Sequence, residues 1–302
     1  MDTSPHNSNS VDINDIELYY LDWGGKGETI IFLTGTGSAA HSFDRLAPRF
    51  TDHFRVLALP RRERSDVPYG LDVASNDIIA FMEALNIEQT ILVGHSITGV
   101  ILTYLAEKHP ERISALIYLD AVYFDVRGQR NILKNSPSRA IPPPIEKTEF
   151  ASVQEYIDYI KYLDPGLSGI WNSMLDETAI YDLEINSEGN FVEVDTSSAT
   201  MQLLEDATNY NPEQINIQVP VLCFEAISTP IRPEYFTEEQ KRVANDFNQN
   251  QWMPFARQRS ARFRQAVPQA KLIEILGANH SCHISHEDLV FDGLRTFFSN
   301  TK

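Results

Sequence analysis

Apolar positions in the first 120 residues alternate between two spacings. Residues 30–33 and 91–93 are wholly apolar, which is typical of strands buried on both faces. Between them, residues 72–85 carry apolar side chains three and four positions apart, which predicts an amphipathic helix. Alternating strands and helices predict an α/β fold with a mostly parallel central sheet flanked by helices.

The remaining elements follow from the same two patterns. Ile16, Leu18 and Tyr20 alternate with Glu17 and Tyr19, which predicts a half-exposed edge strand. A helix is expected directly after the strand at 91–93, and it ends at His109-Pro110 because proline disfavours helix in the residue before it. Further strands are expected at 55–59, 115–119, 219–224 and 271–276, and further helices at 153–163, 238–267 and 287–298.

The strand–helix rhythm stops between residues 122 and 216, where a proline-rich patch (Pro142–Pro144) stands among amphipathic stretches. This predicts a helical lid over 122–216, inserted into an α/β core made of residues 15–121 and 217–302. Residues 1–14 are mostly polar and are expected to be a disordered leader.

Composition narrows the possible partners. The 302 residues are 42% hydrophobic and 22% charged, with a formal net charge of −17. Such a field repels phosphate backbones and anionic membranes, so nucleic acid and membrane are not expected as partners. Two distant cysteines and no apolar run long enough to cross a bilayer predict a cytoplasmic protein without disulfides. We expect a small-molecule substrate, a monomer or homodimer, and no metal or cofactor.

The segment Gly94-His95-Ser96-Ile97-Thr98-Gly99 joins a buried strand directly to an amphipathic helix. A nucleophilic serine at the top of such a sheet needs this sharp strand-to-helix turn, with small residues close by. Gly94 meets the requirement, whereas Thr98 stands where glycine is usual. Ser96 could instead be an ordinary helix cap, but the strand before it and the helix after it favour a nucleophile.

At these residues the chain resembles the α/β-hydrolase superfamily, in particular its lid-bearing serine esterases. His95, Gly99, the step Pro110-Glu111-Arg112 and the step Gly277-Ala278-Asn279-His280 match that family's pattern. The resemblance covers about residues 16–120 and 219–300. It implies that the backbone N–H groups of Thr36 and Ile97 form an oxyanion hole, with Thr34 in place of the family's usual histidine.

Eight histidines compete for the role of general base. His280 follows the last predicted strand by a few residues, in a loop that opens on the same edge of the sheet as Ser96. His283 lies nearby, and His286 better suits the start of the closing helix. His280 is therefore the expected base, and the order from Ser96 to His280 agrees with the resemblance.

The acid of the triad is left open. Relatives usually place an aspartate where this chain has Thr229. Asp120, at the end of the strand at 115–119, is the favoured substitute because some family members use that position. Glu225, at the end of a later strand, is the alternative, and Asp125 or the absence of an acid is a third possibility.

Together these residues predict a serine hydrolase that cleaves a carboxylic ester through an acyl-enzyme on Ser96. Aromatic residues of the inserted segment, among them Tyr156, Tyr159 and Trp171, are more typical of a packed lid core than of substrate contacts. Even so, an apolar pocket and a small hydrophobic substrate are expected. The alternatives are a lyase or cyclase on the same fold and a ligand-binding protein without turnover. Dehalogenase and epoxide hydrolase chemistry is disfavoured, because those relatives carry aspartate at the elbow.

Overall fold

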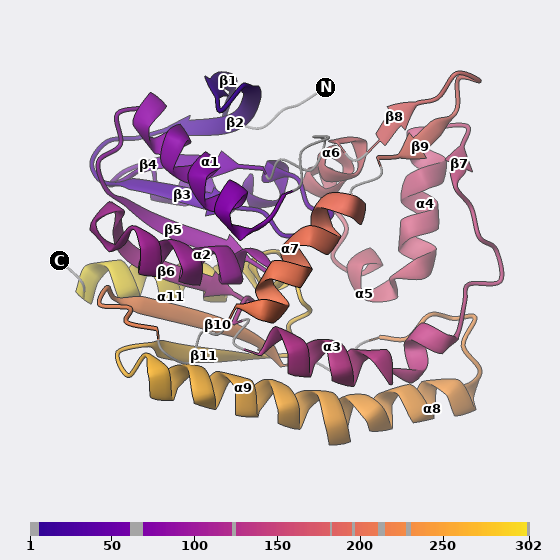
Figure 1. Ribbon diagram of the computed structural model, residues 1–302. Coiled ribbons are helices and arrows are strands. Elements are labelled where there is room, and N and C mark those ends of the chain that lie inside the picture. The colour runs from indigo at the N-terminus through magenta and orange to yellow at the C-terminus, as the bar shows by residue number, and fades with distance from the viewer. Residues whose placement is uncertain are drawn as a thin grey trace.

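The computed structural model describes residues 6–60, 69–122, 125–181, 183–194, 197–210, 215–227 and 231–300. Its centre is an eight-stranded sheet in the order β1-β2-β4-β3-β5-β6-β10-β11 (Figure 1). The pairs β1–β2 and β2–β4 are antiparallel, and the six strands from β4 to β11 pair in parallel. The expected α/β fold with a mostly parallel sheet is therefore confirmed.

The parallel strands are nearly continuous apolar runs because helices cover both faces of the sheet. Their bounds are β3 Thr29–Leu33, β4 Arg55–Leu59, β5 Thr90–His95, β6 Ile113–Leu119, β10 Val221–Ile227 and β11 Lys271–Leu276. The sequence pattern placed each of their ends to within three residues, and β5 and β10 differ most from the expected bounds.

One face of the sheet is covered by α1 (Leu71–Ala84), α2 (Thr98–Lys108) and α9 (Met253–Ala266). The other is covered by α11 (Glu287–Asn300) and two short 3₁₀ turns, η1 (Ala40–Phe43) and η2 (Ala47–Phe50). The helix expected at 238–267 consists of α8 (Glu238–Phe247), a π turn named η6 (Asn248–Trp252) and α9.

The structure corrects the expectation of a disordered leader over residues 1–14 in its described part, and residues 1–5 lie outside the described residues. Residues Asn7–Ile13 form β1, paired in antiparallel register with β2 (Ile16–Gly24). The turn residues Asn14 and Asp15 both have positive φ, which the two-residue hairpin turn requires and which asparagine and aspartate tolerate. Polar side chains suit β1 because it is the edge strand, so its composition resembles that of a leader.

Residues 122–216, called the insertion below, lie beyond the carboxyl edge of the sheet (Figure 1). Its helices are α3 (Val126–Lys134), α4 (Val153–Leu163), α5 (Pro165–Ser168), α6 (Ser173–Tyr181) and α7 (Ser197–Asn209). It is not wholly helical, since β7 (Glu149–Phe150), β9 (Phe191–Glu193) and β8 (Leu183–Ile185) form a small antiparallel sheet. Among the described helices, none is long and apolar enough to cross a membrane.

Candidate active site

Ser96 stands at the turn between β5 and α2. Its φ of 57° lies in the left-handed region, which a non-glycine residue adopts only where the surroundings hold it there. Leu119, the strand partner of His95, supplies one such restraint. Its carbonyl accepts a hydrogen bond from the Ser96 backbone N–H at 3.3 Å. The sequence thus forms the sharp strand-to-helix turn that the elbow pattern predicts.

The unusual Thr98 is accommodated by its own hydroxyl. The Thr98 side chain is buried and its Oγ1 donates to the carbonyl of His95, one turn back. Gly99 provides the close approach instead, because a Cβ there would lie 1.7 Å from the carbonyl oxygen of Ala121. Gly94 is also closely packed, with Leu102 2.8 Å from where its Cβ would be. The departure from the usual pattern therefore leaves the turn intact.

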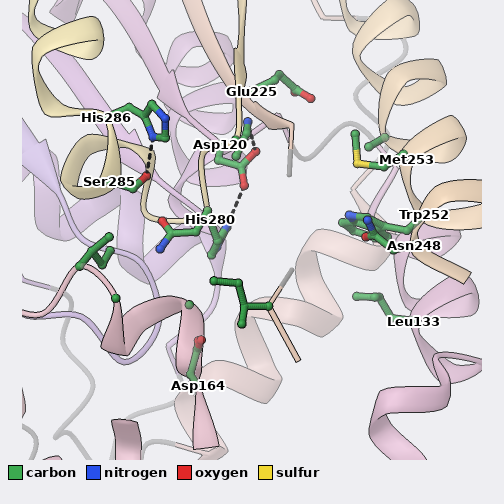
Figure 2. Close-up of a pocket in the computed structure, with 18 of the residues that line it drawn as sticks. Asp120, Leu133, Asp164, Glu225, Asn248, Trp252, Met253, His280, Ser285 and His286 are labelled. Atoms are coloured by element: carbon green, nitrogen blue, oxygen red, sulfur yellow. Dashed lines mark hydrogen bonds and ion pairs between the residues drawn. The ribbon is translucent and has the colours of Figure 1, made fainter. Parts of the chain in front are cut away.

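The structure brings Ser96, His280 and Asp120 together (Figure 2 shows the latter two). His280 Nε2 lies 2.8 Å from Ser96 Oγ, and His280 Nδ1 lies 2.6 Å from Asp120 Oδ2. A carboxylate that accepts from Nδ1–H selects the tautomer in which Nε2 accepts the serine proton. These contacts have the geometry of a nucleophile, a base and an orienting acid.

Asp120 is held by the backbone around it. It follows β6 with a φ of 46°, and its N–H donates to the Phe224 carbonyl at 2.8 Å. Its second carboxylate oxygen, Oδ1, accepts from the backbone N–H of Ala226 at 3.1 Å. The end of β10 therefore fixes the carboxylate that faces His280, although β10 does not supply that carboxylate.

The other acid candidates lie elsewhere. Glu225 is directed away from His280 in Figure 2, and its Oε1 lies 4.0 Å from Arg259 Nη2. Asp125 caps α3 by accepting from the Gly128 N–H at 2.7 Å. Thr229, where relatives usually place the acid, lies outside the described residues.

Burial makes Glu225 a weak acid. Only 3% of the residue is exposed, and this desolvation raises the pKa of Glu225 from 4.5 to about 7, with the Arg259 charge opposing the shift. The folded protein therefore holds this proton between pH 4.5 and 7, where the unfolded chain has released it. It follows that the contribution of Glu225 to stability falls as the pH rises through this window.

We therefore expect Glu225→Gln to gain stability relative to the wild type as the pH rises from 4.5 to 8. The raised pKa of Glu225 corresponds to a difference of about 3 kcal/mol in the free energy of unfolding. Urea unfolding of both proteins across this range measures the difference, and the exposed Glu188→Gln serves as the control. A difference that stays constant with pH would contradict a protonated buried Glu225.

Two further histidines lie behind His280. His95 is buried, and its Nε2–H donates to the backbone carbonyl of His280 at 3.1 Å. The His95 ring lies 4.8 Å from that of His280 and 4.7 Å from that of buried His283. Burial lowers the pKa of His95 well below its ordinary value and that of His283 to about 3, so both rings are neutral.

His95 is a positioning residue that sequence reasoning missed, because the sequence analysis gave it no role beyond matching the family's pattern. Its hydrogen bond to the carbonyl of His280 ties the loop of the base to the turn of the nucleophile. The one available signal was its place next to Ser96 in the motif.

The expected oxyanion loop follows β3 and passes close to the nucleophile. A Cβ on Gly35 would lie 2.8 Å from Ser96 Cβ, so only glycine allows this approach. Thr36 is the next residue, and Ile97 begins the turn into α2, where the first N–H groups of a helix have no partners within it. Ile97 thus adjoins Ser96 in sequence, and Thr36 adjoins Gly35, which packs against Ser96.

A cavity of about 620 Å³ opens beside the base (Figure 2). His280, whose side chain is 53% exposed, and Asp120 lie on one side of it. Leu133 of α3, Trp252 of η6 and Met253 of α9 lie on the other, and polar groups including Asn248 and Asp164 complete the wall. The cavity can hold a small molecule against the base.

The insertion's aromatic residues are not among the described residues that line this cavity. Tyr156, Tyr159, Trp171 and Phe191 pack around Phe150 in a separate apolar cluster. The expectation that these residues form the core of the insertion is therefore confirmed.

This fold and the side chains gathered at its carboxyl edge define a hydrolase of the α/β type. The chain matches the model of the alpha/beta hydrolase family over residues 30–292, and it belongs to that family.

Two curated proteins and one solved structure illustrate the similarity. N-formylmaleamate deformylase of Pseudomonas putida is 28% identical over 166 residues, which cover 53% of this chain and 55% of that protein. Non-heme chloroperoxidase of Streptomyces lividans is 32% identical over 113 residues, 35% of this chain and 41% of that protein. The matches thus span about half or less of the curated relatives.

The crystal structure of E-2-(acetamidomethylene)succinate hydrolase aligns with a TM-score of 0.73 over 97% of this chain and 99% of that one. Its sequence identity is 18%, so this likeness supports the fold alone.

Proposed function

We propose that this protein hydrolyses a carboxylic ester of a small substrate through an acyl-enzyme on Ser96. The observation that carries the proposal is the contact series from Ser96 Oγ to His280 Nε2 and from His280 Nδ1 to Asp120. Family membership makes a hydrolase the expected class, and this series supplies the nucleophile, the base and the acid.

In the first half-reaction, Ser96 Oγ attacks the ester carbonyl carbon while its proton passes to His280 Nε2. The negative charge that develops on the carbonyl oxygen is stabilised by the backbone N–H groups of Ile97 and Thr36. The C–O bond then breaks, the departing alcohol takes the proton from His280, and the acyl group stays on Ser96.

In the second half-reaction, a water molecule gives its proton to His280 and attacks the acyl carbonyl carbon. The second tetrahedral intermediate collapses, the Ser96 oxygen regains its proton, and the carboxylic acid leaves. Asp120 stabilises the imidazolium form of His280 in both halves and keeps the ring in one orientation.

The cavity wall supports a substrate with an apolar part. Leu133, Trp252 and Met253 offer an apolar surface across from His280. Polar side chains, among them Gln129, Asp164 and Asn248, also line the cavity and can bind polar groups of the substrate. A cytoplasmic location and a monomeric or dimeric state stay predictions from composition.

Amide hydrolysis is a second candidate, because two of the similar proteins are named for an amide-containing substrate, N-formylmaleamate and E-2-(acetamidomethylene)succinate. The same residues would serve, with His280 protonating the departing nitrogen. The lyase or cyclase alternative is motivated by Thr98 and by the lack of an acid at position 229, and the contact between Asp120 and His280 weakens the second of these motives.

Stopped-flow kinetics with the ester p-nitrophenyl butyrate and with the corresponding amide, butyryl p-nitroanilide, tests the proposal. The ester is expected to release a burst of about one p-nitrophenolate per chain before the steady state, which is the signature of an acyl-enzyme. Hydrolysis of the anilide at a comparable rate would favour the amide candidate. Release no faster than in buffer, from protein with native circular dichroism, would reject both.

A further inference from the structure

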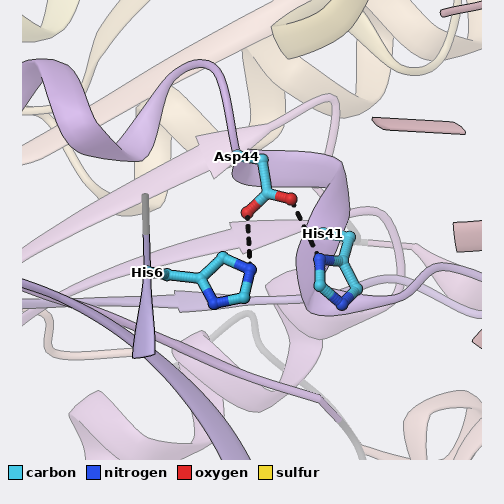
Figure 3. Close-up of side chains that lie close together, drawn as sticks. All are labelled: His6, His41 and Asp44. Carbon is cyan, nitrogen blue, oxygen red and sulfur yellow. Dashed lines mark hydrogen bonds and ion pairs between the residues drawn. The ribbon is translucent and has the colours of Figure 1, made fainter. Parts of the chain in front are cut away.

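Three metal-ligating side chains meet away from the triad (Figure 3). His6 lies directly before β1, whereas His41 and Asp44 lie within one turn at η1. His6 Nε2 lies 3.6 Å from Asp44 Oδ1, and His41 Nδ1 lies 2.9 Å from Asp44 Oδ2. One donor atom from each residue lies within 4.8 Å of the other two.

The cluster is built into the protein interior. The side chains of His6, Asp44 and His41 are 1%, 5% and 16% exposed. The rings of His6 and Trp23 pack nearly at right angles. Phe43, which precedes Asp44 in the sequence, belongs to the apolar core on this face of the sheet. Burying a carboxylate in such surroundings is costly unless a positive charge or good donors compensate it. A cation between the three side chains would supply that charge.

We propose that His6, His41 and Asp44 bind a divalent transition-metal ion, and that Zn²⁺ is the ion they suit best. Two imidazole nitrogens and one carboxylate oxygen are typical zinc ligands, whereas Ca²⁺ and Mg²⁺ prefer oxygen donors. Tetrahedral Zn²⁺ with bonds of about 2.0–2.2 Å holds its ligands roughly 3.4 Å apart. The two histidines approach different oxygens of Asp44, and one donor atom from each residue lies within 4.8 Å of the other two, so the side chains would close around the ion by up to roughly 1.4 Å.

Three protein ligands leave a fourth position for water, which the partly exposed side of His41 can admit. Where no ion is bound, the His41 Nδ1–H group donates a hydrogen bond to the Asp44 carboxylate. Metal and proton therefore compete for His41 Nδ1: on binding, a neutral ring moves its proton to Nε2, and a doubly protonated ring releases one proton.

The ion would join the beginning of β1 to η1, two segments separated by more than thirty residues. η1 begins three residues after Gly37, at the end of the loop that carries Thr36. The ion would therefore stabilise the hairpin edge of the sheet and the segment that follows the proposed oxyanion loop. This role departs from the expectation of no metal, under which His6 was part of the expected leader over residues 1–14.

Calorimetric titration of chelator-treated protein with ZnCl₂ tests the proposal without reference to catalysis. One ion per chain is expected to bind, and Zn²⁺ at about one hundred times Kd should raise the Tm by about 5 °C. Co²⁺ should give the visible absorption bands of a tetrahedral site. His6→Ala should weaken binding of both ions by about 100-fold, because one of three protein ligands is lost.

The exposed His53→Ala is the matched control and should bind like the wild type. Asp44→Asn, measured with Co²⁺ absorption, provides a second variant if His6→Ala alters the fold of the edge strand. Binding that is absent in the wild type, or that His6→Ala and His53→Ala weaken equally, would overturn the proposal and leave the proposed esterase activity untouched.

Discussion

Replacement of Ser96 by alanine is expected to lower kcat for an aryl ester by about 10⁵- to 10⁶-fold, to the level left by substrate binding and the oxyanion hole. The reason is chemical, because no acyl-enzyme can form without Oγ. The fold should survive, since the elbow depends on Gly94, Gly99 and the strand before Ser96. Steady-state kinetics and thermal unfolding of the same preparation measure both effects.

Ser285→Ala is the matched control for this substitution. Ser285 lies on the wall of the same cavity and contacts His286 Nδ1 at 3.1 Å, but it lies outside the Ser96–His280–Asp120 series. Its removal should change kcat by less than tenfold. If Ser96→Ala retained more than about a hundredth of the wild-type kcat, the nucleophile would have to be another residue.

Asp120→Asn is expected to lower kcat by about 10⁴-fold, the effect of the same change in other triads. The amide still fits between His280 and the Ala226 N–H, but it can donate to Nδ1 and so favours the tautomer that cannot accept the serine proton. KM should change little, because Asp120 acts on the base. The pH dependence of kcat/KM should also shift, because the imidazolium loses its charged partner.

Glu225→Gln is the comparison that separates the two acid candidates. Glu225 faces Arg259 and not His280, so this variant should keep kcat within about tenfold of the wild type. The opposite result, a severely impaired Glu225→Gln and an active Asp120→Asn, would make Glu225 the acid of the triad in place of Asp120.

The sheet and the elbow were predictable because each depends on local pattern. Wholly apolar runs mark strands buried on both faces, and a small residue between a strand and an amphipathic helix marks the turn. Ser96 and His280 could be chosen from their places along the chain, since the carboxyl ends of parallel strands share one edge. The structure places these two residues in contact.

Asp120 could only be preferred over Glu225 from the sequence, because both follow strands at that edge. The choice depends on side-chain direction, which is set by the backbone contacts of Asp120 with Phe224 and Ala226. Such contacts between distant segments leave no periodic trace.

The features that were missed also depend on tertiary contacts. β1 was mistaken for a leader because an edge strand can be polar and still pair through its backbone. The small sheet of the insertion is built from strands of two and three residues, too short for alternation to show. His6 and His41 are far apart in sequence, so their approach to Asp44 appears only in the folded chain.

Whether Ser96 is an activated nucleophile can be measured with a fluorophosphonate probe, followed by intact-protein and peptide mass spectrometry. We expect one probe per chain, attached to Ser96, with labelling lost in Ser96→Ala, strongly slowed in His280→Ala and retained in Ser285→Ala. Folded wild-type protein that stays unlabelled, or that carries the probe on a different residue, would contradict this expectation.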